Sequence, residues 1–293
     1  MKKTILFVAL IQLVNSSTLA AGEPWSKSID MGLNLTQNSY SDSWTGGEAG
    51  NISWVSKADA IFEKQFSPKF NFKNISKLQF GQTHTQDKET KVWARPTKST
   101  DKIDIENLGR ITLDTYVDPY IAFRIESQFL DASYDPLKRY INPILLTESA
   151  GVARMLYEKE KDQILSRLGF SVRQSMNKII VDTTAETFET ETSSDGGIES
   201  VSDIHFVFSE RLNYIGKLSL FKALFYSEKD AFIGTPAEDY WKAVDVNFES
   251  TISASVTKYV VVTLYAQLLY DKQVDLRGRF KETLALGLTY KFL

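Results

Sequence analysis

The last ten residues of the chain alternate between two kinds of side chain. Large apolar side chains occupy every second position: Leu284, Leu286, Leu288, Tyr290 and Phe292. Small or polar side chains occupy the positions between them: Ala285, Gly287, Thr289 and Lys291. Because successive side chains of a β-strand point to opposite faces, this period of two predicts a strand with one apolar and one polar face.

The same alternation recurs along the chain and predicts about twelve strands. Twelve segments show it: residues 29–37, 51–66, 70–86, 103–117, 120–130, 147–158, 163–176, 198–211, 217–227, 241–256, 260–270 and 280–292. The phase of 147–158 and 217–227 is unclear, which leaves ten or fourteen strands as the nearest alternatives. Residues 154–170 also have the composition of an amphipathic helix, but a charged hairpin turn at their centre would keep the flanking strands in register.

The gaps between these segments alternate between short and long. The short gaps are residues 67–69, 118–119, 158–161, 212–216 and 257–259. The long, polar gaps are residues 38–50, 87–100, 131–146, 177–197, 228–240 and 271–279. A β-sandwich has no reason to sort its loops by length, whereas a transmembrane barrel has short periplasmic turns and long extracellular loops. The pattern therefore predicts an all-β fold, a single antiparallel transmembrane β-barrel of about twelve strands.

The start of the chain predicts export. Two lysines precede an apolar run over residues 5–14, and small residues follow up to Ala20. This order indicates a signal peptide over residues 1–20 and a barrel over 21–293, with an uncleaved N-terminal helix as the alternative. After the signal no run of about eighteen apolar residues occurs, so the sequence predicts no transmembrane helix. The expected compartment is the cell outer membrane.

Composition excludes several classes of function. The sequence has no cysteine, and therefore no disulfide framework and no thiolate metal site. A net charge of −3 and a pI near 5.6 provide no basic footprint for nucleic acid. Mean hydropathy is mildly negative, at −0.22, which a barrel permits because polar lumen-facing residues offset the lipid-facing ones.

The chain resembles an uncharacterised family of bacterial outer-membrane β-barrels, catalogued only as a domain of unknown function. Short motifs in a shared order carry the resemblance: GLNLTQ at 32–37, WTGGE at 44–48, KIDI at 102–105, SQF at 127–129, Pro143, SAG at 149–151, LYD at 269–271 and LGLTYKF at 286–292. The resemblance implies a fold and a compartment, and it supplies no catalytic or ligand-binding residue. Leu293 departs from the usual barrel ending, which is an aromatic residue.

A search for catalytic groups predicts that the protein is not an enzyme. The two histidines, His84 and His205, invite comparison with outer-membrane phospholipases, which use a Ser/His/Asn site. No serine follows His84 at a suitable spacing, and Ser209 is four residues from His205. On one strand that spacing is about 13 Å, too far for a nucleophile and its base. We expect no catalytic residue, no metal site and no cofactor.

The polar faces of the predicted strands place charged side chains of both signs in the lumen. The candidate lumen residues are Arg110, Arg124, Arg167, Arg173, Glu106, Glu126 and Glu249. Apolar residues on the opposite faces should contact lipid: Phe123, Ile125, Phe170, Phe248, Leu264 and Leu286. Charges inside a barrel pair with one another, because an isolated charge is costly to desolvate. The lumen is therefore expected to be either a salt-bridged plug or a narrow polar pore.

These observations favour a narrow channel or transporter for a small hydrophilic solute, with the lumen arginines offering donors to carboxylate or phosphate. The alternative is a structural or ligand-binding barrel that acts through its extracellular loops, especially the acidic residues 177–197. A membrane phospholipase is the third reading. The expected partners are outer-membrane lipid and lipopolysaccharide, and the barrel-assembly machinery through the C-terminal strand. We expect a monomer that does not bind nucleic acid.

Overall fold

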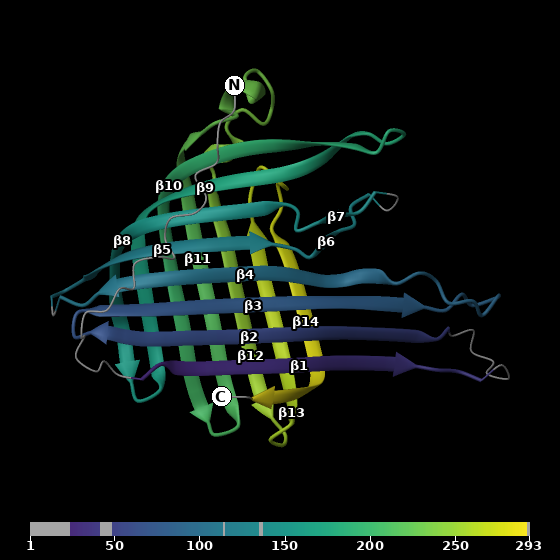
Figure 1. Cartoon of the computed structure of the whole chain (residues 1–293), viewed down its shortest axis with the longest axis horizontal. Helices are drawn as coiled ribbons and strands as arrows, with labels where there is room; N and C mark the ends of the chain where they lie inside the picture. The colour runs from purple at the N-terminus through teal and green to yellow at the C-terminus, as the bar shows by residue number, and fades with distance from the viewer. Residues whose placement is uncertain (1–23, 42–48, 114, 135–136, 292–293) are drawn as a thin grey trace, which may run out of the picture.

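The computed structural model describes residues 24–41, 49–113, 115–134 and 137–291, which form a closed antiparallel barrel of twelve strands (Figure 1). The strands are β1 (Ser26–Asn38), β2 (Asn51–Ser67), β3 (Phe70–Thr85), β4 (Thr97–Ile111), β5 (Asp118–Ser127), β8 (Ile144–Lys159), β9 (Asp162–Asp182), β10 (Thr187–Ser209), β11 (Leu212–Tyr226), β12 (Val244–Ser255), β13 (Val260–Tyr270) and β14 (Arg279–Lys291). The predicted fold class and strand number are confirmed. The predicted signal peptide, residues 1–20, lies outside the described residues.

Two small features lie at the long-loop end of the barrel. Strands β6 (Leu130–Asp131) and β7 (Arg139–Tyr140) form a separate two-stranded sheet between β5 and β8. Two 3-10 helices, η1 (Lys229–Phe232) and η2 (Tyr240–Lys242), lie between β11 and β12. Within the part of the chain that the structure describes, no helix has the length and apolar character needed to cross a membrane.

The wall is arranged as two layers that cross each other. In Figure 1 the strands β1 to β5 run across the front, whereas β11 to β14 run at a steep angle to them behind. Around the barrel the order is β1-β14-β13-β12-β11-β10-β9-β8-β5-β4-β3-β2, which places β4 and β12 six strands apart in either direction. These two strands therefore lie on opposite walls, and side chains from them can meet across the lumen.

Glycines allow β8 and β9 to approach closely where they bend. Gly151 and Gly169 are directly paired across the two strands. A Cβ on Gly151 would lie 2.2 Å from the backbone oxygen of Leu168, and a Cβ on Gly169 would lie 2.8 Å from the Tyr120 hydroxyl. Tyr120 is buried here with Leu108 and Ala153 in a small apolar cluster. This cluster is the only buried hydrophobic cluster found among the described residues, so most apolar surface faces outward.

Four sequence-based boundaries were wrong. Residues 177–197 were predicted to be a loop, but β9 and β10 continue through them as a hairpin. Within this hairpin, a Cβ on Gly197 would lie 2.0 Å from the Lys222 oxygen, so close strand packing explains this glycine. The turn predicted at 212–216 lies in strand β11, which begins at Leu212.

The third wrong boundary concerns the segment predicted as 103–117. Strand β4 covers Thr97–Ile111, because the polar residues 97–102 pair with β3 instead of forming a loop. The fourth wrong boundary is the turn predicted at 118–119, which lies in β5, since that strand begins at Asp118. The remaining short turns and long loops alternate along the chain as predicted, and both the start of β1 and the end of β14 lie at the short-turn end.

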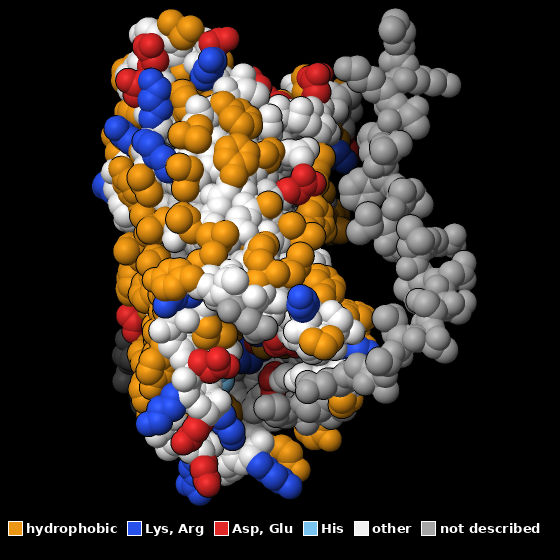
Figure 2. Space-filling model, turned by 90° about the vertical axis from the view of Figure 1, so that its left-hand side faces the viewer, with side chains coloured by type: hydrophobic (Ala, Val, Ile, Leu, Met, Phe, Trp, Pro, Cys, Tyr) orange, Lys and Arg blue, Asp and Glu red, His pale blue; other side chains and the backbone are white. Residues whose placement is uncertain are grey.

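The outer wall is apolar where the alternation predicted it. Phe170, Leu264 and Leu286 are exposed at the barrel surface. Figure 2 shows a face on which hydrophobic side chains predominate in the middle and charged side chains gather toward the two ends. On β14 the outward side chains that the structure describes, from Leu284 to Tyr290, are 52–71 % exposed. Lipid is the medium that such a surface requires.

Candidate lumen site

Strand β4 supplies the centre of the lumen site because its inward positions carry charge at every second residue. Lys102, Asp104 and Glu106 alternate along it, and the adjacent strand β5 contributes Arg124 and Glu126. The Arg124 guanidinium donates two parallel hydrogen bonds to Asp104, from Nε at 2.8 Å and from Nη2 at 2.9 Å. Its Nη2 also lies 3.0 Å from Glu126. The planar guanidinium fork matches a carboxylate in this way, so Arg124 is held rigidly.

A second set of contacts crosses from β4 to the opposite wall. Lys102 on β4 donates to Glu249 on β12 at 2.9 Å, and Lys77 on β3 lies 3.8 Å from the same carboxylate. Glu249 is buried. Because β4 and β12 are on opposite sides of the barrel, the Lys102–Glu249 pair spans the lumen.

A third set of contacts surrounds Glu106. Its carboxylate accepts from Lys217 on β11 at 2.6 Å and pairs with Arg167 on β9 at 2.7 Å. Arg167 also lies 3.1 Å from Asp203 on β10 and 5.6 Å from the Tyr120 ring. Side chains from four other strands, β5, β9, β11 and β12, therefore contact the inward face of β4.

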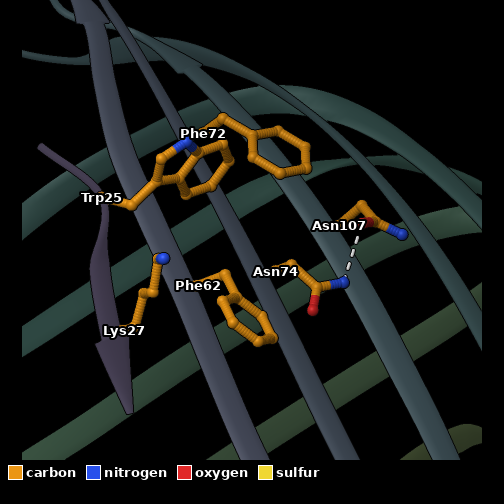
Figure 3. Close-up of a pocket in the computed structure, with 6 residues that line it drawn as sticks. All are labelled: Trp25, Lys27, Phe62, Phe72, Asn74 and Asn107. Atoms are coloured by element: carbon orange, nitrogen blue, oxygen red, sulfur yellow. Dashed lines mark hydrogen bonds between the residues drawn. The ribbon is translucent and has the colours of Figure 1, made fainter. Parts of the chain in front are cut away.

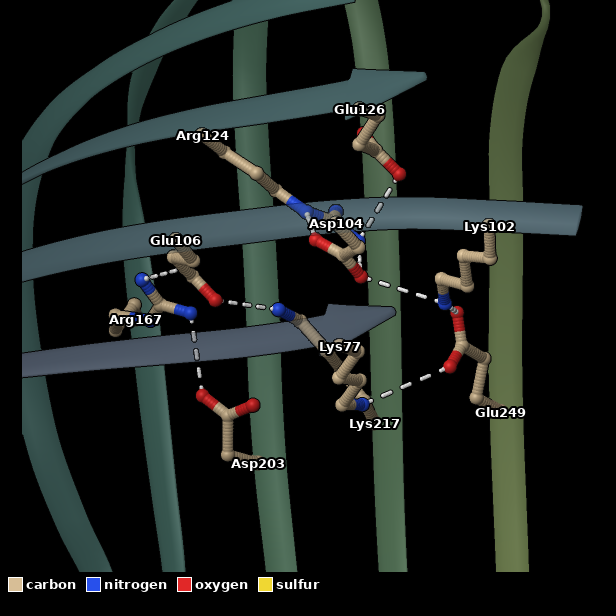
Figure 4. Close-up of polar contacts among 10 residues, drawn as sticks. All are labelled: Lys77, Lys102, Asp104, Glu106, Arg124, Glu126, Arg167, Asp203, Lys217 and Glu249. Carbon is tan, nitrogen blue, oxygen red and sulfur yellow. Dashed lines mark hydrogen bonds and ion pairs between the residues drawn. The ribbon is translucent and has the colours of Figure 1, made fainter. Parts of the chain in front are cut away.

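These contacts form one group, which we call the lumen network (Figure 4). It contains five cations, Lys77, Lys102, Arg124, Arg167 and Lys217, and five anions, Asp104, Glu106, Glu126, Asp203 and Glu249. The formal charges of the network therefore cancel. The side chains of Lys77 and Glu126 are each 29 % exposed, so the network is not fully buried.

The two other predicted arginines lie outside this group. Arg173 pairs with Asp195 at 2.5 Å and Asp245 at 2.9 Å, and its guanidinium carbon is 3.6 Å from the centre of the Phe221 ring. Arg110 lies 3.9 Å from Asp118 at the short-turn end. All seven candidate lumen residues thus take part in ion pairs, and five of them are brought together in the lumen network.

Three residues that take part in these ion pairs were not predicted from the sequence. Lys102 was assigned to no strand, although it continues the alternation of Asp104 and Glu106 and could have been found from it. Lys217 was placed at the edge of a turn, and Asp195 was assigned to a turn before two glycines. Each of these errors follows from a wrong strand boundary.

The histidines do not form a catalytic pair in the described structure. His84 pairs with Ile52 near the end of β3, and His205 lies between Gln163 and Ile215 in the register of the wall. Among the described residues no group of three or more His, Cys, Asp or Glu side chains is arranged to hold a metal ion.

Comparisons with known proteins agree with this class of fold. A family described as "Protein of unknown function (DUF3078)" matches residues 35–133, and the resemblance drawn from the sequence is confirmed over that stretch. No curated protein matches. The chain is thus a closed twelve-stranded antiparallel β-barrel, similar over residues 35–133 to a family of unknown function.

Several solved structures match this chain at low sequence identity. One is the COG4313 outer membrane channel of Pseudomonas putida F1, with 12 % identity, 95 % of this chain and 99 % of that chain covered, and a TM-score of 0.41. The translocator domain of the autotransporter NalP from Neisseria meningitidis has 7 % identity, 92 % and 88 % coverage, and a TM-score of 0.39. OprB of Pseudomonas putida has 10 % identity, 92 % and 94 % coverage, and a TM-score of 0.30.

Proposed function

We propose that this chain is an outer-membrane barrel that offers a small hydrophilic solute a narrow path across the membrane, with its short turns in the periplasm. The observation that supports this proposal is the lumen network. Ten charged side chains line the middle of the barrel, and several of them keep part of their surface accessible to water. An interior that only had to be filled could be built from apolar side chains at lower desolvation cost.

The charge balance of the network indicates how a solute would pass. Rings of charged side chains set the selectivity of a pore, and here equal numbers of both signs predict weak selectivity between anions and cations. Arg124 and Arg167 face carboxylates that a solute carboxylate or phosphate could replace one bond at a time. Arg110 and Arg173 extend the same chemistry to the two sides of the network.

A second function is favoured by one specific contact. The Lys102–Glu249 hydrogen bond joins opposite walls directly, at 2.9 Å, and leaves no room for a solute between the two groups. If this contact persists, the barrel is a closed support for its long loops, and binding takes place on the protruding β9–β10 hairpin. Glu186, Glu189 and Glu191 are exposed there.

Single-channel conductance in planar bilayers tests the proposal. We expect the wild-type protein to conduct in small steps with little ion selectivity. Glu249→Gln removes one anion from the network and leaves Lys77 without its carboxylate partner and Lys102 with Asp104 alone, so the permeability ratio should shift toward anions. The matched control is Glu63→Gln, because Glu63 pairs only with Lys73, 3.2 Å away on the neighbouring strand. A wild-type barrel and a Glu249→Gln barrel that both remain closed would contradict the channel and favour loop-mediated binding.

A further inference from the structure

The outer wall carries a groove that differs from the rest of the lipid-facing surface. It lies over β1 to β4 and is lined by Trp25, Lys27, Phe62, Phe72, Asn74 and Asn107 (Figure 3). In the register of the wall, Lys27, Phe62, Asn74 and Asn107 form one continuous row across four strands. Since Phe123 continues the same row on β5, these side chains are on the outer face.

On the side nearest the β2–β3 turn, the groove is bounded by a cluster of aromatic rings. Trp25 packs edge-on against Phe66, with ring centres 5.6 Å apart, and against Phe72 at 6.4 Å. Phe66 also contacts Phe70 at 6.1 Å. Amphipathic aromatic rings concentrate where a barrel wall meets lipid headgroups, so this cluster marks the headgroup level at the short-turn end.

Two lysines lie next to this aromatic cluster without an acidic partner among the described residues. Lys64 lies 5.8 Å from the Trp25 ring centre and 5.3 Å from that of Phe66. Lys27 is exposed, and Figure 3 shows its ammonium group directed toward Trp25. Across the described residues, no carboxylate forms an ion pair with either lysine. Two positive charges at one headgroup level are therefore available to an anion from outside the protein.

The far side of the groove is polar, which is unusual on a face toward lipid. Asn74 donates from Nδ2 to the Asn107 side-chain oxygen at 2.9 Å, and Ser76 donates to Asn74 at 3.1 Å. The Asn107 amide nitrogen has no recorded acceptor in the described structure. Asn107 is half-buried on the outer face, and an amide donor that faces lipid favours an acceptor, such as the ester carbonyl of a glycerolipid.

We propose that this groove binds one anionic phospholipid of the inner leaflet. The lipid phosphate lies between Lys27 and Lys64, a glycerol ester carbonyl accepts from the Asn107 amide, and the acyl chains cover Phe62 and Phe72. This site depends on the outer-membrane placement proposed above, and it does not depend on an open lumen. Charge complementarity and the spare amide donor favour this occupant over a second protein or a free anion.

Lipid retention by the folded protein tests the site. Full-length barrel in mixed micelles with equal amounts of phosphatidylglycerol and phosphatidylethanolamine is analysed by native mass spectrometry, with heat-modifiable gel migration as the check of folding. We expect the wild-type protein to retain phosphatidylglycerol preferentially. Each lysine near an anionic headgroup contributes about fivefold, so Lys27→Ala with Lys64→Ala should lower that preference on the order of 25-fold.

The matched control is Lys159→Ala, at the short turn between β8 and β9, where Glu158 and Glu160 flank the lysine. Asn107→Leu is a second test that keeps both charges, and it should weaken retention of both lipids without changing the preference. The proposal is overturned if the double variant keeps the wild-type preference, or if Lys159→Ala lowers it equally. Full displacement of the lipid by inorganic phosphate would also overturn it, because the site would then bind a free anion. Conductance results do not bear on these outcomes.

Discussion

The ladder of paired residues is longest between β9 and β10 and shortest between β1 and β14. The β9–β10 ladder runs from Thr187 with Asp182 to His205 with Gln163, and its two strands follow each other directly in the chain. The β1–β14 ladder contains only five residue pairs, from Asp30 with Lys291 to Asn34 with Gly287. The long ladder is a local hairpin, whereas the short one joins strands from the two ends of the chain, and such non-local pairing carries a larger loop-closure cost.

This difference indicates how the barrel stays closed. Beyond the short seam, the last residues of β1 (35–38) do not pair with the first residues of β14 (279–286). The lumen network ties β4 to β12 across the middle, which is a second route by which distant parts of the wall are held together. We infer that backbone pairing at the seam and side-chain pairing in the lumen both keep the barrel closed.

Proline in the seam should have the largest effect. Leu33 is one of the five β1 residues paired with β14 and also pairs with β2, so Leu33→Pro removes a ladder hydrogen bond and should prevent closure. We expect loss of the heat-modifiable folded band. Thr190→Pro is the control, because Thr190 is in the part of the β9–β10 hairpin that extends beyond the neighbouring strands. Equal tolerance of both prolines would contradict the proposed weakness of the seam.

The lumen tie is tested by Glu106→Gln. Glu106 is buried against Lys217 and Arg167, so removing its charge leaves Lys217 without its carboxylate partner and Arg167 with Asp203 alone. Breaking a buried pair from one side costs about 3–5 kcal/mol in free energy of unfolding, measurable by urea titration of the barrel in bilayers. Adding Lys217→Met should recover part of the loss. No recovery in the double variant would argue against a paired network.

A pH effect should appear in the loop that supports the base of the β9–β10 hairpin. Asp131 is paired with Arg139 at 2.8 Å and accepts from Asn142 at 2.8 Å, while Arg139 and Asn142 contact Lys178 and Asn177. Burial raises the pKa of Asp131, but hydrogen bonds from Ser133 and Asn142 and the Arg139 charge hold it below its usual 3.8. Its contribution is therefore fully present above pH 3.8 and is lost as the pH falls through the lowered pKa.

We expect protease protection of residues 128–143 to fall below pH 3.8, with a loss of local opening free energy of about 1–3 kcal/mol. The Asp131→Asn protein should show weak protection that does not change with pH. If the wild-type loop remains equally protected at pH 3 and pH 7, Asp131 does not hold it.

The smallest effect is expected at the tip of the same hairpin. Val181 is 59 % exposed and lies beyond the last β8 partner of β9, which is Met176. Val181→Ser should change the free energy of unfolding by no more than about 0.5 kcal/mol. A loss comparable to that of Glu106→Gln would show that the protruding hairpin contributes to the stability of the whole barrel.

The sequence was sufficient for the strand pattern and the two faces of the wall. Residues such as Arg124, Arg173 and Glu249 were assigned to the lumen from alternation alone, and the structure pairs each of them with an opposite charge. It was insufficient at polar boundaries. Residues 177–197 read as a loop, because threonine, serine and glycine are common to loops and to strands that project into water.

The local geometry of the β-strand determined, from sequence alone, which residues face outward and which face inward, because alternation is a property of neighbouring residues. The partner of each charge depended on the closed and layered barrel. Lys102 and Glu249 are 147 positions apart and belong to opposite walls, and no periodic pattern relates them. The lysine reaches that glutamate only after closure brings β4 over β12, and for this reason the charge pairs of the lumen are a property of the assembled wall.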